Sequence, residues 1–404
     1  MIKMMLKYEL KKIFSKRINQ AVIVGTFLIA VIIALLAVGS VRYVDENGDG
    51  YTGGLSARYL AEDQNRWKGE LTSEQIGQIV KKVKDLSAKY PEEIPDNEYG
   101  KTVQSYEPIT DFVIGILTPD TEWDNSVLYQ LSDEQAADIY TLYQENMGKM
   151  AEEYGTTPEK KELIENVYET VETPLDYEAA VSWDTMLMYT QNYIIILAVV
   201  IGFLSISIFS GEFRSGTEGV FLAAKYGRTK AVKNKVLTGI LMTTLIYWVG
   251  MGILDLIAFG VMGTSGFFTP YQISEPYCIY SMTYGEYHLL MLLMGYIASL
   301  FSASLTMLII VKTRSTAVAA AVPFVLFCML PFIGRMASDF TTFFDFMPSV
   351  FSNIIEYVKS PLIFQIGGFA FRQLPFVILL YSALFIVMLP FAYRCYRCYG
   401  LRKH

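Results

Sequence analysis

Residues 209–235, FSGEFRSGTEGVFLAAKYGRTKAVKNK, form a basic segment between two long apolar runs. The segment contains six basic side chains and two acidic ones. An excess of Lys and Arg beside membrane spans is typical of a cytoplasmic loop. The sequence therefore predicts a membrane protein whose chain crosses the bilayer on both sides of this loop.

Within this loop, Ser215 and Glu218 have the spacing of a capping box, which predicts a helix start. The apolar run 220–224 follows, and Gly227 stands where a left-handed helix cap is expected. We predict a helix of about ten residues at the inner membrane surface, joined rigidly to the flanking spans. A cytosolic partner that presses on this helix would move both spans.

The first 41 residues predict an interfacial helix followed by the first span. Residues 1–17 place apolar side chains on one helical stripe and most of the lysines elsewhere, as in a helix lying in the membrane interface. Residues 18–41 contain 24 positions without a charge, enough to cross the bilayer core. A cleaved signal peptide is disfavoured, because the apolar run is too long and no convincing small-residue cleavage site follows it.

Charge predicts the orientation of the chain. Residues 42–184 carry 31 acidic and 12 basic side chains, whereas the segments predicted to be cytoplasmic carry 18 basic and three acidic ones. The formal net charge of −7 therefore hides two oppositely charged faces. We expect residues 42–185 to be extracellular, both termini to be cytoplasmic, and the membrane to be the plasma membrane.

The polar segment 42–185 is expected to be mainly helical. Thr72 and Ser132 each precede a Gln by three residues, and Thr157 precedes a proline, so three helix starts are predicted. The likeness of the first two starts leaves an internal repeat as an alternative, although capping chemistry alone would produce it. The segment contains no cysteine and hence no disulfide.

Residues 45–50, DENGDG, match the opening of a calcium-binding loop. The position that should supply the closing bidentate glutamate is Ser56. We therefore favour a glycine-rich turn leading out of the membrane.

The remaining apolar runs complete an all-α polytopic fold with six transmembrane helices. The predicted spans are 18–41, 186–210, 236–262, 287–311, 316–335 and 374–393. The predicted connections after the polar segment are the cytoplasmic loop 211–235, the outer loop 263–286, the cytoplasmic turn 312–315, the outer segment 336–373 with re-entrant or interfacial helices, and the cytoplasmic tail 394–404.

Several span residues suggest roles. Asp255 is an ionisable residue near the outer end of the third span, so it lines a pathway or reaches water. Gly295, Ser299 and Ala303 recur every four residues, which predicts close helix packing. Prolines at positions 323 and 331 predict bends in the fifth span.

Taken together, these features resemble the permease subunit of an ABC type-2 transporter, in the Gram-positive variety with a large extracellular domain. The local likeness lies in 209–212 (FSGE), 215–217 (SGT), 227–230 (GRTK) and Lys235. The resemblance implies that the inner loop is a coupling helix that docks on a separate ATPase subunit. The residues implied to act in coupling are Glu212, Ser215, Gly216, Thr217, Glu218, Phe221, Tyr226, Gly227, Arg228 and Lys235.

The sequence offers little for catalysis. It contains no P-loop motif, so ATP would be bound by the partner subunit, and the chain is expected to hold no cofactor or metal of its own. His288 and His404 are the only histidines. Cys395 and Cys398 are interpreted as inert thiols, with a redox pair or an acylation site as the alternative.

The expected function is that of a non-catalytic permease subunit that exports or extracts a hydrophobic compound or peptide. The expected partners are cytosolic ABC ATPase subunits, a second permease copy or a paralogue, and the lipid membrane, with no nucleic acid. The alternative is a membrane sensor or resistance protein whose acidic, aromatic extracellular domain binds a cationic peptide.

Overall fold

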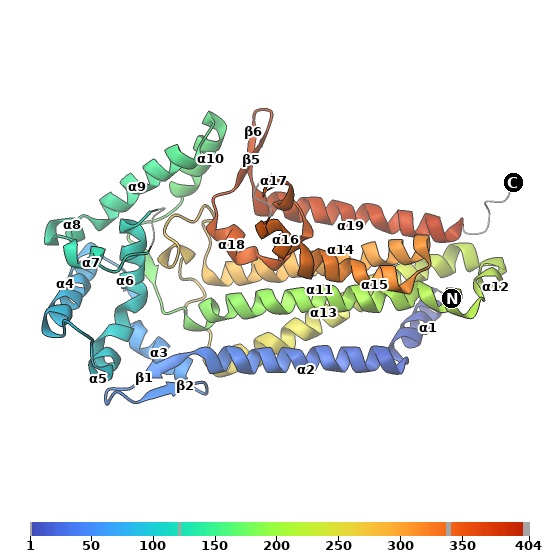
Figure 1. The fold of residues 1–404 in the computed structure, drawn as a ribbon, viewed down its shortest axis with the longest axis horizontal. Coiled ribbons are helices and arrows are strands. Elements are labelled where there is room, and N and C mark those ends of the chain that lie inside the picture. Colours follow the sequence, from blue (N-terminus) through green and yellow to red (C-terminus); the bar gives the residue numbers. More distant parts are fainter. Residues whose placement is uncertain (1, 120–122, 337–340, 399–404) are drawn as a thin grey trace.

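The computed structural model describes residues 2–119, 123–336 and 341–398. The chain is 75% helical. Six of its helices are long and apolar enough to cross a membrane, as the sequence predicts. Figure 1 shows these helices side by side, with a separate group of short helices at one end.

Each predicted span overlaps one of these helices. They are α2 (Arg17–Ser40), α11 (Val181–Ser215), α13 (Val232–Met262) preceded by the π-helical turn η3 (Gly227–Ala231), α14 (Tyr284–Thr313), α15 (Thr316–Phe324) continued by η5 (Val325–Met329) and α16 (Leu330–Met336), and α19 (Gln373–Arg397). We call one end of this bundle the basic end: it carries α1 (Ile2–Phe14), α12 (Glu218–Ala223) and the C-terminal end of α19.

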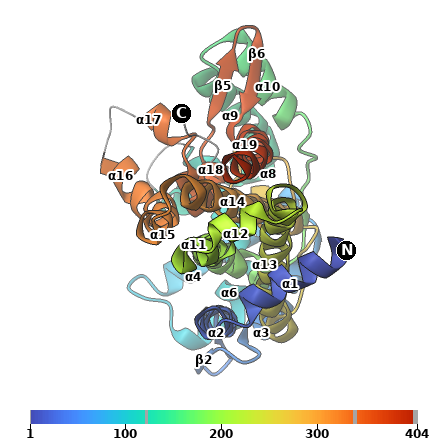
Figure 2. The same cartoon turned by 90° about the vertical axis from the view of Figure 1, so that its right-hand side faces the viewer.

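Helices α11 and α14 form the centre of the bundle, and α2, α15 and α19 lie around them (Figure 2). The close approach depends on small residues. A Cβ on Gly295 would lie 2.6 Å from both Ile194 and the Tyr247 hydroxyl, and Ser299 and Ala303 are buried. The predicted small-residue packing stripe is therefore confirmed.

The fifth span departs from a regular α-helix after Pro323. The proline lies inside α15, and the π-helical segment η5 follows directly. A proline removes one backbone donor and crowds the preceding turn, so the hydrogen-bonding pattern must shift there. A π-helical irregularity therefore follows Pro323, whereas the bends predicted at Pro323 and Pro331 stay a prediction.

Residues 42–180 fold into a helical unit, which we call the polar domain. Its elements are β1 (Arg42–Val44), β2 (Gly50–Thr52), α3 (Ser56–Gln64), η1 (Asn65–Trp67), β3 (Gly69–Glu70), α4 (Ser73–Lys89), α5 (Asp96–Glu98), η2 (Tyr99–Val103), α6 (Gln104–Leu117), α7 (Val127–Gln130), α8 (Asp133–Ala137), α9 (Ile139–Tyr154), α10 (Pro158–Tyr168) and β4 (Asp176–Tyr177). Strands β1 and β2 pair antiparallel, as do β3 and β4.

The predicted helix starts of the polar domain are confirmed. Thr72 and Ser132 form capping boxes with Gln75 and Gln135, and Thr157 caps α10 with a proline at its first turn. In the 45–50 segment, Asp45 accepts hydrogen bonds from the backbone amides of residues 47 and 49 at 2.9 Å each. This carboxylate closes the turn between β1 and β2, as the turn interpretation requires.

The connection from α13 to α14 is more deeply buried than a loop resting on a surface. Tyr271, within the short helix η4 (Tyr271–Ile273), is 2% exposed. Tyr143 of the polar domain donates a hydrogen bond to the Pro276 carbonyl, and Tyr277 donates to the Ile116 carbonyl. This connection therefore joins the polar domain to the bundle.

The segment before α19 contains the predicted short helices and an unpredicted hairpin. The helices are α17 (Thr341–Phe344), η7 (Pro348–Ser352) and α18 (Ile354–Lys359); the prediction for residues 337–340 lies outside the described residues. Strands β5 (Ile363–Ile366) and β6 (Phe369–Arg372) form the hairpin, which protrudes beside α10 in Figure 1. Gly367, in the turn of the hairpin, has a φ of +61°. The sequence pattern that could have predicted this hairpin is a pair of glycines between two short, largely apolar strands.

Candidate functional site

The loop between α11 and α13 lies at the basic end, but its local structure differs from the prediction. Helix α11 continues through Ser215 and ends at Gly216, which has a φ of +63°. The Ser215 hydroxyl donates to the Gly211 carbonyl at 3.0 Å, one turn back. The predicted capping box is wrong, because this hydroxyl serves the end of α11 and not the start of α12.

Helix α12 spans six residues, fewer than predicted, and begins after Thr217 without a side-chain cap. Gly227 is not its left-handed cap, since that conformation belongs to Gly216. Glycine is required at position 227 for another reason. A Cβ there would lie 1.9 Å from the Phe221 carbonyl oxygen, so only glycine lets the chain pass this close to α12.

Four charged side chains from three helices meet beneath this loop. We call Glu9, Lys12, Glu212 and Lys235 the ion cluster. The Lys235 ammonium donates to both Glu212 carboxylate oxygens at 3.0 and 3.1 Å and to Glu9 at 3.3 Å. Lys12 donates to Glu212 at 2.5 Å. The cluster therefore ties α1 to the adjoining ends of α11 and α13.

The ion cluster is balanced and largely sealed from water. The Lys235 side chain is 0% exposed, and its ammonium also donates to the Ile208 carbonyl at 2.7 Å. Two carboxylates face two ammonium groups, so no charge is left uncompensated. Burial alone would lower the pKa of Lys12, but the Glu212 carboxylate raises that pKa above its ordinary value.

The same loop also contacts the end of the last helix. Phe221 of α12 and Phe213 of α11 pack edge-on against the ring of Tyr396, which is 0% exposed. Arg228 donates a hydrogen bond to the Arg397 carbonyl at 2.6 Å. The short helix is thereby linked to α19 as well as to α11 and α13.

One face of α12 is open to solvent. Leu222 is buried, while Val220 is 77% exposed. The neighbouring Ser215, Gly216 and Thr217 are exposed too. Helix α12 therefore buries one face and leaves the other exposed at the basic end.

The structure brings together some of the predicted site residues and not others. Glu212 and Lys235 join the ion cluster, and Phe221 and Arg228 contact α19. The rest lie along the loop outside the cluster: Ser215, Gly216, Thr217, Glu218, Tyr226 and Gly227. Lys225 and Lys230 lie over the Tyr226 ring at 5.6 and 4.6 Å.

Sequence reasoning missed three members of this site: Glu9, Lys12 and Tyr396. Glu9 had a signal, because it is the only acidic residue among six basic ones in residues 1–17. Nothing in the sequence pairs it with Lys235, which is 226 positions away.

Asp255 lies at the opposite end of the bundle, where it contacts His288. The Asp255 carboxylate lies 3.3 Å from His288 Nε2, and its side chain is 23% exposed. Trp183 and Phe259 pack around the imidazole at ring distances of 5.5 and 5.4 Å. The sequence suggested Asp255 alone, and the structure adds the histidine.

Cys395 and Cys398 are free thiols near the end of α19. Within the described residues, no group of three or more His, Cys, Asp and Glu side chains could hold a metal ion. A comparison of the chain with protein-family models and with curated proteins finds no significant match.

Proposed function

We propose that the chain is the transmembrane permease subunit of an ATP-driven ABC type-2 transporter, with ATP bound by a separate cytosolic subunit. The observation that carries this proposal is the ion cluster beneath α12. It ties α1, α11 and α13 together, and its Lys235 side chain, which is 0% exposed, places the ammonium 5.3 Å from the Phe221 ring of the six-residue helix α12. We expect the ion cluster to keep these three helices together when one of them moves, because separating them would leave buried charges without their partners.

In this proposal, the basic end faces the cytosol of a plasma-membrane protein, as its excess of Lys and Arg favours. ATP-driven closure of two ATPase subunits presses on α12. The ion cluster passes the movement to α1, α11 and α13, and Tyr396 passes it to α19. The motion opens and closes a path between two permease copies, or between this chain and a paralogue, for export of a hydrophobic compound or peptide.

The test is a pull-down of the tagged chain from native membranes, followed by identification of bound proteins and an ATP hydrolysis assay. Val220→Asp places a charge on the open face of α12 without touching the ion cluster. Ile366→Asp is the matched control, because Ile366 is also exposed, at 66%, but lies on the β5–β6 hairpin.

We expect a P-loop ATPase to accompany the wild-type chain and the Ile366→Asp variant, and to be lost or reduced at least tenfold with Val220→Asp. Recovery of the chain without an ATPase would refute the transporter assignment. Equal recovery with both variants would refute the role of α12.

A second candidate function is a membrane sensor or resistance protein whose polar domain binds an external cationic peptide. The observation that favours it is a group of carboxylates, including Asp111 and Asp184, around a pocket between the polar domain and the bundle. Recovery with a signalling protein and no ATPase in the pull-down would support this candidate over the transporter.

A further inference from the structure

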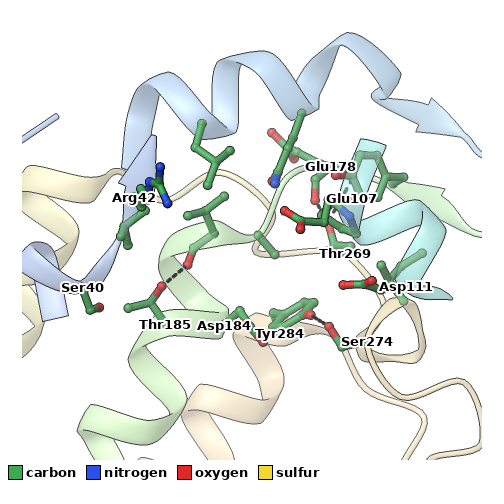
Figure 3. Close-up of a pocket in the computed structure, with 18 residues that line it drawn as sticks. Ser40, Arg42, Glu107, Asp111, Glu178, Asp184, Thr185, Thr269, Ser274 and Tyr284 are labelled. Atoms are coloured by element: carbon green, nitrogen blue, oxygen red, sulfur yellow. Dashed lines mark hydrogen bonds between the residues drawn. The ribbon is translucent and has the colours of Figure 1, made fainter. Parts of the chain in front are cut away.

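A pocket of about 300 Å³ lies where the polar domain meets the bundle. Its walls come from distant parts of the chain: the start of β1, helices α3 and α6, the segment around β4, the start of α11, the α13–α14 connection and the first residue of α14. Figure 3 shows Glu107 and Asp111 extending from α6 on the side of the pocket opposite Arg42.

The pocket has an excess of negative charge. Four carboxylates line it, from Glu107, Asp111, Glu178 and Asp184, and Arg42 is the only cationic side chain among the described lining residues. Glu178 is paired with Lys68 at 2.8 Å. Asp111 and Asp184 form no ion pair with any residue that the structure describes.

The carboxylates of this pocket repel one another. Burial, with the nearby carboxylates of Glu107 and Asp184, raises the pKa of Asp111 to about 6. The Asp111 side chain is exposed, so solvent screens part of this repulsion. A cation placed among these groups would relieve the repulsion.

A polar group without a partner also lines the pocket. Tyr177 is 2% exposed, and its hydroxyl has no hydrogen-bond partner among the described residues. A buried hydroxyl without a partner costs free energy unless a ligand satisfies it. Nearby, Ser274 and Tyr284 share a hydrogen bond at the pocket wall, as Figure 3 shows.

We propose that this pocket binds a guanidinium group, as carried by an arginine side chain of a cationic peptide. A planar guanidinium offers five donors, which can bind carboxylates in pairs, and this matches the lining of Asp111 and Asp184. The pocket volume of about 300 Å³ lies at the lower limit for drug-sized ligands. The pocket can therefore hold one side chain but not a whole peptide. An organic cation fits better than a metal ion, since the described residues offer no group of three metal ligands.

This inference does not depend on the transporter function. Binding is measured on the chain alone, without an ATPase subunit, so failure of the coupling proposal leaves it intact.

The experiment uses the full chain in nanodiscs of zwitterionic lipid and measures fluorescence anisotropy at pH 7.5. The probe is a fluorescein-labelled tri-arginine peptide, and the neutral comparison is the corresponding tri-citrulline peptide. The double variant Asp111→Asn/Asp184→Asn removes the two unpaired carboxylates. The matched control is Glu145→Gln/Glu153→Gln, which removes the same charge from exposed positions on α9 that do not line the pocket.

We expect the wild-type chain to bind tri-arginine at least tenfold more tightly than tri-citrulline. The pocket variant should lose at least tenfold in affinity for tri-arginine, and the α9 variant less than threefold. Equal losses in the two variants would overturn the proposal, because they would show only general attraction to an acidic domain. Equal binding of the two peptides by the wild-type chain would overturn it as well. If the double variant misfolds, the Asp184→Asn single variant provides the same comparison.

Discussion

Replacing Glu212 with Gln removes the centre of the ion cluster while keeping the size of the side chain. Lys235 then stays fully buried and keeps Glu9 at 3.3 Å and the Ile208 carbonyl at 2.7 Å as its partners. Breaking a buried ion pair by removing one partner typically costs about 3–5 kcal/mol. Because Glu9 still supplies one negative charge, we expect the lower value, about 3 kcal/mol of unfolding free energy.

The geometry also predicts an asymmetry. In Lys235→Met, Glu212 keeps Lys12 at 2.5 Å, and the Lys12 side chain is 37% exposed. The remaining pair is partly solvated, so we expect a smaller loss, about 1 kcal/mol. The double variant Glu212→Gln/Lys235→Met leaves Glu9, which is 16% exposed, and Lys12, which is 37% exposed, and it no longer contains the fully buried ammonium. The free energy of unfolding of the double variant should lie within about 1 kcal/mol of the wild-type value. Its loss of stability would then be much smaller than the sum of the two single losses.

The assay is unfolding of the detergent-solubilised chain by added SDS, followed by tryptophan fluorescence. Glu218→Gln is the matched control, because it makes the same chemical change in the same loop and Glu218 forms no ion pair within the described residues. The reasoning would be refuted if Glu212→Gln and Glu218→Gln differed by less than about 0.5 kcal/mol, or if the double variant showed the simple sum of the single losses.

Two further predictions concern the loop and the pocket. Gly227→Ala should destabilise the chain by more than about 2 kcal/mol and speed hydrogen exchange in α12, because the new Cβ would lie 1.9 Å from the Phe221 carbonyl; Gly219→Ala, with no atom within 4 Å, should be neutral or stabilising. The pKa of Asp111 is raised to about 6 from an ordinary 3.8, so the folded chain binds this proton more tightly than the unfolded chain does. The contribution of Asp111 to the free energy of unfolding therefore becomes more favourable as pH falls from about 7 to 4. Asp111→Asn should therefore raise stability at pH 7 by about 1 kcal/mol after screening by pocket water, and should flatten that pH dependence, whereas exposed Glu153→Gln should do neither. An unchanged pH profile in Asp111→Asn would contradict this account.

Local rules in the sequence predicted the six long apolar helices and the helix starts of the polar domain. A span is recognised from length and lack of charge, and a cap from groups three positions apart, so each needs only neighbouring residues. The same reasoning failed at Ser215, where one hydroxyl could serve either of two helices. The choice depended on how far α11 continued, and α11 runs through Ser215 to Gly216.

The ion cluster and the pocket were decided by tertiary structure. Glu9 and Lys235 meet only because α1 packs against α13, and Asp111 and Asp184 share a pocket only because α3 contacts both α6 and α11. Which side chains face one another across two helices depends on the rotation and crossing of those helices. That geometry is set by packing over the whole bundle, at glycines such as Gly295, and no short segment of sequence contains it.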